Sequence, residues 1–328
     1  LDESEMHARE RMEAICEAGV NRSDADLKQF IIRCEGESTS RVAPWLICGT
    51  VTEQAELLRR CFADGFASNV VKKVYPEVAT YLNADLDIDN AALEEYFRDY
   101  RELKIAGRVT PEFCEKAQEA VPPISVQSRD AIVQRYASDK DCALFVVDAM
   151  GVEWLPMLVA LAREQNMGVY SIEVGKANLP TSTKFNNIYW PDSNRRLQDI
   201  KRFDNIAHNG VEAHETRKAE ENLAAALNVI SEPLLPRISE GLAQYERVLV
   251  TADHGSSRLA LLAWKNNLAR TLTCEADAYI ANWRYREQAS HGGCPLELEE
   301  TLDGEHWVVR GYNRLPKKGG GQGFELHG

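Results

Sequence analysis

The sequence lacks any long hydrophobic segment. None of its 328 residues belongs to a run of about 18 apolar residues, the length that a membrane-spanning helix requires. The opening segment, LDESEMHARERMEAICEAG, is charged and has no signal-peptide core. We therefore expect a cytoplasmic protein without a membrane span. Because the chain does not begin with Met, we also expect it to be a piece of a longer protein.

Paired cysteines and an excess of positive charge are missing too. The eight cysteines are scattered and form no CxxC pair, as expected for reduced cysteines in the cytoplasm. The formal net charge of −13 argues against a general nucleic-acid coat, which neutralises phosphates with Lys and Arg. It does not exclude a nuclease, because metal ions can meet phosphate charge locally.

The N-terminal part of the sequence has a helical pattern. Apolar residues recur at helical spacing, and Ser23, Asn90 and Thr110 are placed to cap helices. We expect residues 1–138 to form a helical domain or appendage without chemistry of its own. The clearest helical segments are 5–19, 23–36, 90–103 and 110–123.

From residue 142 the pattern changes to alternating strands and helices. The run CALFVVDAMG is apolar throughout, which is typical of a strand buried on both faces of a parallel sheet. We expect residues 139–328 to be an α/β domain with an open, mostly parallel sheet flanked by helices. Strands are expected within 142–151, 167–175, 245–255, 274–285, 305–314 and 324–328, and helices within 153–166, 213–244 (broken at Pro233) and 256–269.

Acidic and imidazole side chains stand at the ends of these strands. Ligand sites in such folds lie beyond the carboxyl ends of the strands, and Asp and His suit zinc or manganese. Each residue alone has another explanation, such as a helix cap or a solvated turn. Because the strand-end residues are expected to lie at the same edge of the sheet, we favour a metal site. The candidate ligands are Asp148, Asp204, His208, Asp253, His254 and His327.

A nucleophile is available in the loop NLPTSTKFNN, residues 178–187. Thr181, Ser182 and Thr183 offer three hydroxyls, and a bound metal ion would lower the pKa of one of them. A polar loop that caps a helix is the alternative interpretation.

The motifs VVDAMG, LPTSTKFN, DNIAH, VTADHG and FELHG, taken in order, resemble the PglZ family of the alkaline-phosphatase superfamily. PglZ proteins belong to BREX bacteriophage-exclusion systems. The resemblance covers about residues 140–328, and it implies an alkaline-phosphatase-like fold that continues beyond Gly328, so the domain is expected to be truncated at its C-terminal end.

The resemblance assigns roles to the candidate residues. One metal ion would be held by Asp148, Thr183, Asp253 and His254, and the other by Asp204, His208 and His327. Thr183 would be the nucleophile, with Thr181 and Ser182 as alternatives in a shifted register. Asn186 and Lys184 would bind phosphate oxygens. His291, in the segment SHGGCP, is an alternative to His327.

The implied function is that of a metal-dependent phosphatase or phosphodiesterase, a nuclease included, in antiphage defence. The neutral Asn186 favours diesters, and the two ions are expected to be Zn²⁺, with Mn²⁺ or Mg²⁺ as alternatives. Expected partners are a nucleotide or DNA substrate and other defence proteins. The alternative is a non-catalytic scaffold of a defence complex that holds structural metal. A mutase or transferase is disfavoured because the gap between the TST loop and DNIAH is short.

Overall fold

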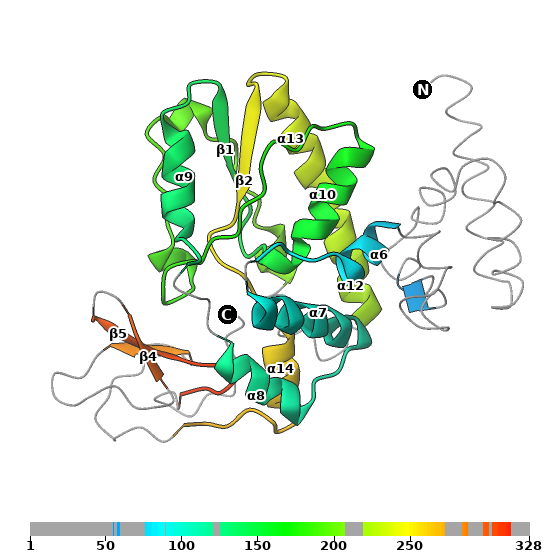
Figure 1. The fold of residues 1–328 in the computed structure, drawn as a ribbon, viewed down its shortest axis with the longest axis vertical. Helices are drawn as coiled ribbons and strands as arrows, with labels where there is room; N and C mark the ends of the chain where they lie inside the picture. The colour runs from blue at the N-terminus through cyan, green and yellow to red at the C-terminus, as the bar shows by residue number, and fades with distance from the viewer. Residues whose placement is uncertain are drawn as a thin grey trace, which may run out of the picture.

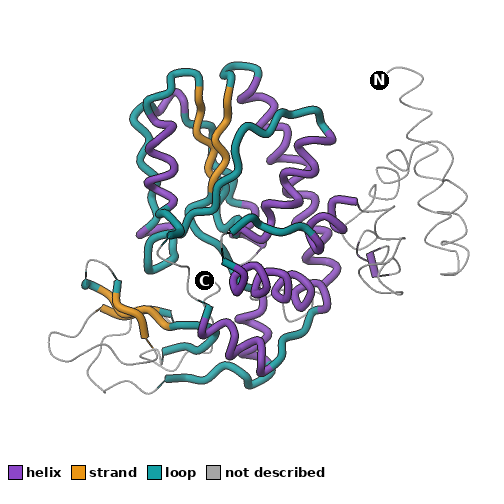
Figure 2. The backbone as a smooth tube through the Cα atoms, viewed as in Figure 1, coloured by secondary structure: helices purple, strands orange, loops and turns teal. Residues whose placement is uncertain are grey.

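The structure is a computed structural model. Its described residues combine helices with two small sheets (Figures 1 and 2). Two segments expected to be helical, 5–19 and 23–36, lie outside the residues described here. The structure describes residues 76–88, 90–120, 125–206, 219–272, 284–287, 298–301 and 304–315, together with 55, 58 and 59.

The described N-terminal helices begin where their capping residues predict. The Asn90 side chain accepts a hydrogen bond from the Leu93 amide, and Thr110 accepts one from the Phe113 amide. Each cap satisfies an amide that has no partner inside the helix. Both predicted caps are therefore confirmed. The helices are α6 (Pro76–Asn83), α7 (Ala91–Ala106), α8 (Pro111–Glu119) and α9 (Arg129–Ala137).

A short parallel sheet lies at the centre of the α/β part. Strand β1 (Cys142–Val146) pairs in parallel with β2 (Arg247–Thr251) over their whole lengths. On the other edge of β1, residues 196–200 form two isolated parallel bridges, to Leu144 and Val147. The prediction of a mixed α/β fold with parallel strands is thus confirmed.

Helices cover both faces of this sheet (Figure 1). Leu144 and Val146 of β1 pack against α9, whereas Phe145 and Val147, which alternate with them, belong to the core on the opposite side. That second core is formed with α10 (Leu155–Glu164), α12 (Ala219–Val229) and α13 (Leu235–Leu242). The predicted break at Pro233 is a π-helical segment, Ile230–Leu234.

The strand expected within 167–175 is not formed. Residues 167–175 form no regular secondary structure, and the isolated bridge between Lys176 and Ser128 lies just after them. The apolar side chains of this segment are not buried, since Tyr170 is 80% exposed and Ile172 is 41% exposed. The available edge of β1 is occupied by residues 196–200 instead, so the apolar pattern was misleading here.

The helices of the expected appendage share a core with the α/β part. Tyr81 of α6 and Ile105 of α7 lie in the same cluster of buried residues as Phe145 and Leu227. In the described residues, a boundary at 138/139 therefore does not separate two hydrophobic cores. No described helix is both long and apolar enough to cross a membrane.

The C-terminal part adds an antiparallel sheet. Strand β5 (His306–Val309) lies between β3 (Tyr285–Glu287) and β4 (Leu298–Glu300). The strand expected within 305–314 is thus confirmed for its first part. Helix α14 (Arg258–Lys265), capped by Ser257, follows β2 as predicted.

Candidate metal centre

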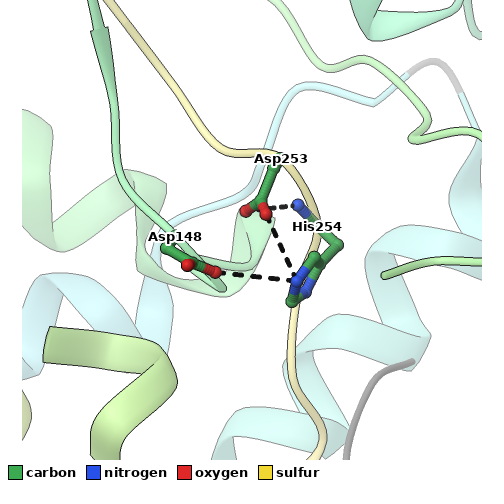
Figure 3. Close-up of side chains that lie close together, drawn as sticks. All are labelled: Asp148, Asp253 and His254. Carbon is green, nitrogen blue, oxygen red and sulfur yellow. Dashed lines mark hydrogen bonds and ion pairs between the residues drawn. The ribbon is translucent and has the colours of Figure 1, made fainter. Parts of the chain in front are cut away.

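Three buried side chains meet at the edge where β1 and β2 end (Figure 3). Asp148 lies two residues after β1, and Asp253 and His254 follow β2. Because the strands are parallel, both ends fall at the same edge of the sheet. One ligand atom from each of the three residues lies within 4.8 Å of the others. The edge predicted from the sequence therefore does bring these three residues together.

The Asp253 carboxylate is held in place by backbone amides. Its Oδ1 accepts hydrogen bonds from the Ala149 amide at 3.1 Å and from the His254 amide at 2.9 Å. Ala149 has a φ of 61°, a left-handed conformation that is unfavourable for a residue with a side chain. The turn after β1 thus places its amide on the carboxylate at a conformational cost. Asp253 Oδ2 is left to face the site.

Asp148 is a buried carboxyl close to two other acidic side chains. Burial, and then the neighbouring carboxylates of Asp253 and Asp204, raise its pKa to about 7, while Lys201 opposes the shift. Its Oδ1 has no hydrogen-bond donor among the described residues, and the closest ion-pair contact is His254 Nε2 at 3.6 Å. A buried carboxylate oxygen without a donor is costly. A cation at this position would remove that cost.

The imidazole of His254 faces the two carboxylates with its Nε2 atom. This nitrogen lies 3.3 Å from Asp253 Oδ2, and Nδ1 lies 2.9 Å from the Gly255 carbonyl oxygen. If the imidazole proton is on Nδ1, it can be donated to that carbonyl oxygen, and the lone pair on Nε2 can then bind a metal ion. The carbonyl contact is therefore the kind of support that metal-binding histidines use.

The Thr183 hydroxyl joins this cluster from a distant part of the chain. Its Oγ1 donates a hydrogen bond to Asp253 Oδ2 at 2.8 Å and lies 3.1 Å from His254 Nε2. Thr183 begins the short 3-10 helix Thr183–Phe185 and is exposed, whereas the three candidate ligands are buried. Of the three hydroxyls in the loop, the structure thus brings Thr183 to the ligands, which is the register preferred from the sequence.

Asn186 differs from its expected role. Its side chain is fully buried, and its amide nitrogen contacts the carbonyl oxygens of Asn178, Pro180 and Ser182 at 3.0–3.1 Å. Its Oδ1 accepts from the Asn178 amide at 2.8 Å. With all these groups engaged inside the loop, the amide has no donor left for a phosphate oxygen. Asn186 organises the loop instead.

The second predicted ion is described only in part. Asp204 lies half-buried on the helical turn at 202–206, near enough to raise the pKa of Asp148. His208, His327 and the alternative His291 lie outside the described residues. Lys184 is exposed, with its Nζ 5.0 Å from the centre of the Phe185 ring.

Two residues that contact this site or its loop were not predicted from the sequence. Arg129 and Asp130 open helix α9, where the Ser128 cap explains them locally. Arg129 is nevertheless buried and donates to the Asp253 carbonyl oxygen at 2.5 Å. Asp130 accepts from the Asn178 side chain at 2.9 Å. No spacing in the sequence signals these contacts, because they join segments more than forty residues apart.

Comparison with known proteins adds nothing to this geometry. No family model, curated protein or solved structure matches the chain. The chemistry of the site has to be inferred from its own residues.

Proposed function

We propose that this protein is a metal-dependent hydrolase of phosphate esters that uses Thr183 as its nucleophile. The observation that carries the proposal is the position of the Thr183 hydroxyl, which donates to Asp253 and lies 3.1 Å from His254 Nε2. A hydroxyl beside a cluster of metal ligands is the arrangement that metal activation of a nucleophile requires.

The buried residues fit a divalent cation. Two carboxylates and one imidazole suit Zn²⁺ or Mn²⁺, and the Thr183 oxygen would be a fourth ligand. The charges favour a cation as well, since burial and then repulsion from Asp253 raise the pKa of Asp148, and a cation would offset both. The buried Asp148 Oδ1, which has no donor in the described part of the chain, supports the same interpretation.

Each residue of the candidate site would have its own role in the reaction. A bound divalent ion would lower the pKa of the Thr183 hydroxyl and offset charge on the phosphate. Asp253 Oδ2 is placed to accept the hydroxyl proton at 2.8 Å. Thr183 Oγ1 then attacks phosphorus, the ester oxygen leaves, and water later releases the phosphate from threonine. Lys184, next to the nucleophile and exposed, would bind a phosphate oxygen.

The preference for diesters no longer follows. It depended on Asn186 as a neutral phosphate ligand, and that side chain is engaged inside the loop. With the cation of Lys184 beside Thr183 instead, the substrate is proposed only as a phosphate ester. A second ion at Asp204, His208 and His327, and a role in BREX-type defence, are supported by the motif resemblance alone.

The experiment is a hydrolysis assay on nitrophenyl phosphate mono- and diesters, cyclic nucleotides and DNA, with metal-stripped and reloaded protein. We expect turnover to require metal and to fall on the order of 10³-fold in Thr183→Ala and in Asp253→Ala. Thr181→Ala, which removes another hydroxyl of the same loop, is the matched control and should keep most activity.

Unchanged turnover in Thr183→Ala would sink the proposal. Turnover that survives complete removal of metal would instead favour His254 Nε2 as a general base for Thr183, since the two atoms lie 3.1 Å apart. Metal binding without turnover on any substrate would favour the non-catalytic scaffold.

A further inference from the structure

A buried arginine connects the metal-ligand edge to helix α9. Arg129 is 6% exposed, and its Nη1 donates to the Asp253 carbonyl oxygen at 2.5 Å and contacts the Ala252 carbonyl oxygen at 3.4 Å. A buried guanidinium needs acceptors in several directions, and its planar fork fixes where they lie. The end of β2, just where its metal ligands begin, is therefore held by a residue 124 positions earlier in the chain.

The same guanidinium orients Asp130, and Asp130 reaches the nucleophile loop. Asp130 Oδ1 accepts from Arg129 Nε at 2.9 Å and from Nη2 at 2.5 Å. The other oxygen, Oδ2, accepts from Asn178 Nδ2 at 2.9 Å. Because charge-assisted hydrogen bonds are short and directional, Asp130 transmits the position of Arg129 to the first residue of the loop.

Asn178 and Asn186 then fix the loop itself. The two residues exchange two hydrogen bonds, at 2.8 and 3.0 Å, across the base of the loop. The Asn186 amide also contacts the Ser182 carbonyl oxygen at 3.1 Å. Ser182 immediately precedes Thr183, whose hydroxyl returns to Asp253 at 2.8 Å. The contacts therefore begin and end at Asp253.

We propose that Arg129, Asp130, Asn178 and Asn186 form a closed hydrogen-bond circuit that sets the distance between the Thr183 oxygen and the metal ligand Asp253. They are positioning residues, since they act through the loop and through the Asp253 backbone. This inference rests on the proposed function for its purpose, but the four positioning residues are not candidate metal ligands. In well-positioned enzymes, a displacement of about 1 Å can cost about 10²-fold in rate.

Close packing at the start of the loop supports the circuit. A Cβ on Gly175 would lie 2.9 Å from the Arg129 Cα and 2.8 Å from the Ile132 Cδ1, so no larger residue fits between the loop and α9. The Arg129 amide donates to the Lys176 carbonyl oxygen at 2.9 Å. Backbone and side-chain contacts thus both attach the segment that leads into the loop to the first turn of α9.

A simpler interpretation is that Arg129 and Asp130 only stabilise the start of α9. An acidic residue in the first turn does favour a helix. That role predicts no effect at residue 183, so the two interpretations differ in a measurable way. The weakest connection is the one between Asp130 and Asn178, which is exposed, and removing it should therefore leave the fold intact.

The test measures the position of residue 183 without needing activity. In this 328-residue chain, Thr183→Cys places a thiol at the proposed nucleophile position, and Co²⁺ is titrated into the metal-stripped protein. A thiolate bound to cobalt gives a charge-transfer absorption band, and the unsubstituted chain, with its eight cysteines, supplies the background. We expect a new band in Thr183→Cys.

Asn178→Ala and Asp130→Ala are then each added to Thr183→Cys. We expect each to reduce the band at least twofold while the stoichiometry of cobalt stays unchanged. Asn187→Ala and Asp192→Ala are the controls. Asn187 is an exposed asparagine at the end of the same loop, and Asp192 is an aspartate that pairs with Arg195 at 43% side-chain exposure, close to the 39% of Asp130. Both controls should keep the band.

Each outcome decides between the proposals. A band in Thr183→Cys that neither Asn178→Ala nor Asp130→Ala weakens would overturn the circuit and leave the proposed function standing. Loss of cobalt binding together with the band would overturn the circuit too, because the residues would then maintain the whole site. Absence of any new band in Thr183→Cys would overturn the proposed function, and the circuit with it. In chains that keep Thr183, Asn178→Ala should lower kcat about tenfold with KM changed less than twofold.

Discussion

At the scale of single residues, the protonation of Asp148 would decide when the candidate site can accept a cation. Its pKa of about 7 means that below neutral pH the carboxyl keeps a proton, which a metal ion must displace. The largest cause of this shift is burial, followed by repulsion from Asp253 and Asp204. Metal binding is therefore expected to be coupled to proton release in the physiological range.

Metal affinity should consequently rise with pH up to about 7. Below that value, proton displacement at Asp148 should weaken zinc binding by up to about tenfold per pH unit. Isothermal titration with zinc at pH 5.5, 6.5 and 7.5, in buffers of different ionisation enthalpy, measures both affinity and protons released. Asp148→Asn should bind more weakly and lose this proton release. Equal proton release in the parent and in Asp148→Asn would contradict the assignment.

The residues of the site differ in how far the sequence could predict them. Asp148, Asp253 and His254 were predictable because each follows an apolar run with a clear strand pattern, and the carboxyl ends of parallel strands lie at the same edge of a sheet. Asn186 was misjudged because an amide after a Thr-rich loop can face either the substrate or its own backbone. Only the folded loop, with three carbonyl oxygens converging on one nitrogen, decides between them.

At the scale of elements, helices α6 and α7 support the turn that follows Asp148. Glu153, in the 3-10 helix Val152–Trp154, is 3% exposed and accepts from Lys104 Nζ at 2.7 Å and from the Tyr81 hydroxyl at 2.7 Å. Lys104 also lies 4.2 Å from the centre of the Trp154 ring. A buried carboxylate with these partners ties the first turn after Asp148 to both helices.

Removing the lysine should leave Glu153 as an uncompensated buried charge. Lys104→Met, which keeps the apolar length of the side chain, should lower the free energy of unfolding by about 3–5 kcal/mol. Lys116→Met, which breaks the exposed pairs with Asp99 and Glu95, should have a much smaller effect. Urea unfolding of the two variants measures the difference. Similar losses in both would show that burial of the Glu153 pair has no special weight.

Elements with local signals were predicted better than those without. The predicted caps Asn90 and Thr110 each act within three residues, so the sequence locates their helices. The segment 167–175 has a strand pattern, but a strand also needs a free neighbour. Residues 196–200, which gave no strand pattern, occupy that edge of β1. Pairing across the chain is a tertiary property that a local pattern does not contain.

At the scale of the whole molecule, two buried carboxyls make stability depend on pH. Burial is the main cause that raises the pKa of both Glu77 and Asp148 to about 7. Such groups favour the folded state while they are protonated, so their contribution is complete below their unfolded pKa and is lost as pH rises through about 7. Metal binding acts on Asp148 alone, because Glu77 lies outside the candidate site.

Metal-free protein should therefore become less stable between pH 5 and pH 8. Each carboxyl contributes a loss of up to about 1.4 kcal/mol per pH unit below its folded pKa. Asp148→Asn should remove its share and be more stable than the parent at pH 8 without metal. Urea unfolding at four pH values, with and without zinc, measures these slopes. A parent and an Asp148→Asn variant with identical slopes would show that Asp148 is not protonated in the fold.

The division into parts was also beyond the sequence. Helical periodicity identified α7 and α8 but gave no information on their packing partners. Buried residues of α6 and α7 complete the core around β1, so the expected appendage is part of the support of the site. The change in hydrophobic pattern near residue 140 marks a change from helices to alternating strands and helices. In the described residues it does not mark a boundary between two hydrophobic cores.

The contact between Gly151 and Gly255 has a consequence for which ions the site would select. A Cβ on Gly255 would lie 3.2 Å from the Gly151 Cα, so the two loops that carry the candidate ligands touch through their backbones. Zinc–oxygen bonds of about 2.0–2.2 Å and calcium–oxygen bonds of about 2.3–2.6 Å differ by a few tenths of an ångström. A side chain at Gly255 would move the loops apart by a similar amount. Under the proposed function, we therefore expect Gly255→Ala to weaken the binding of zinc relative to that of calcium.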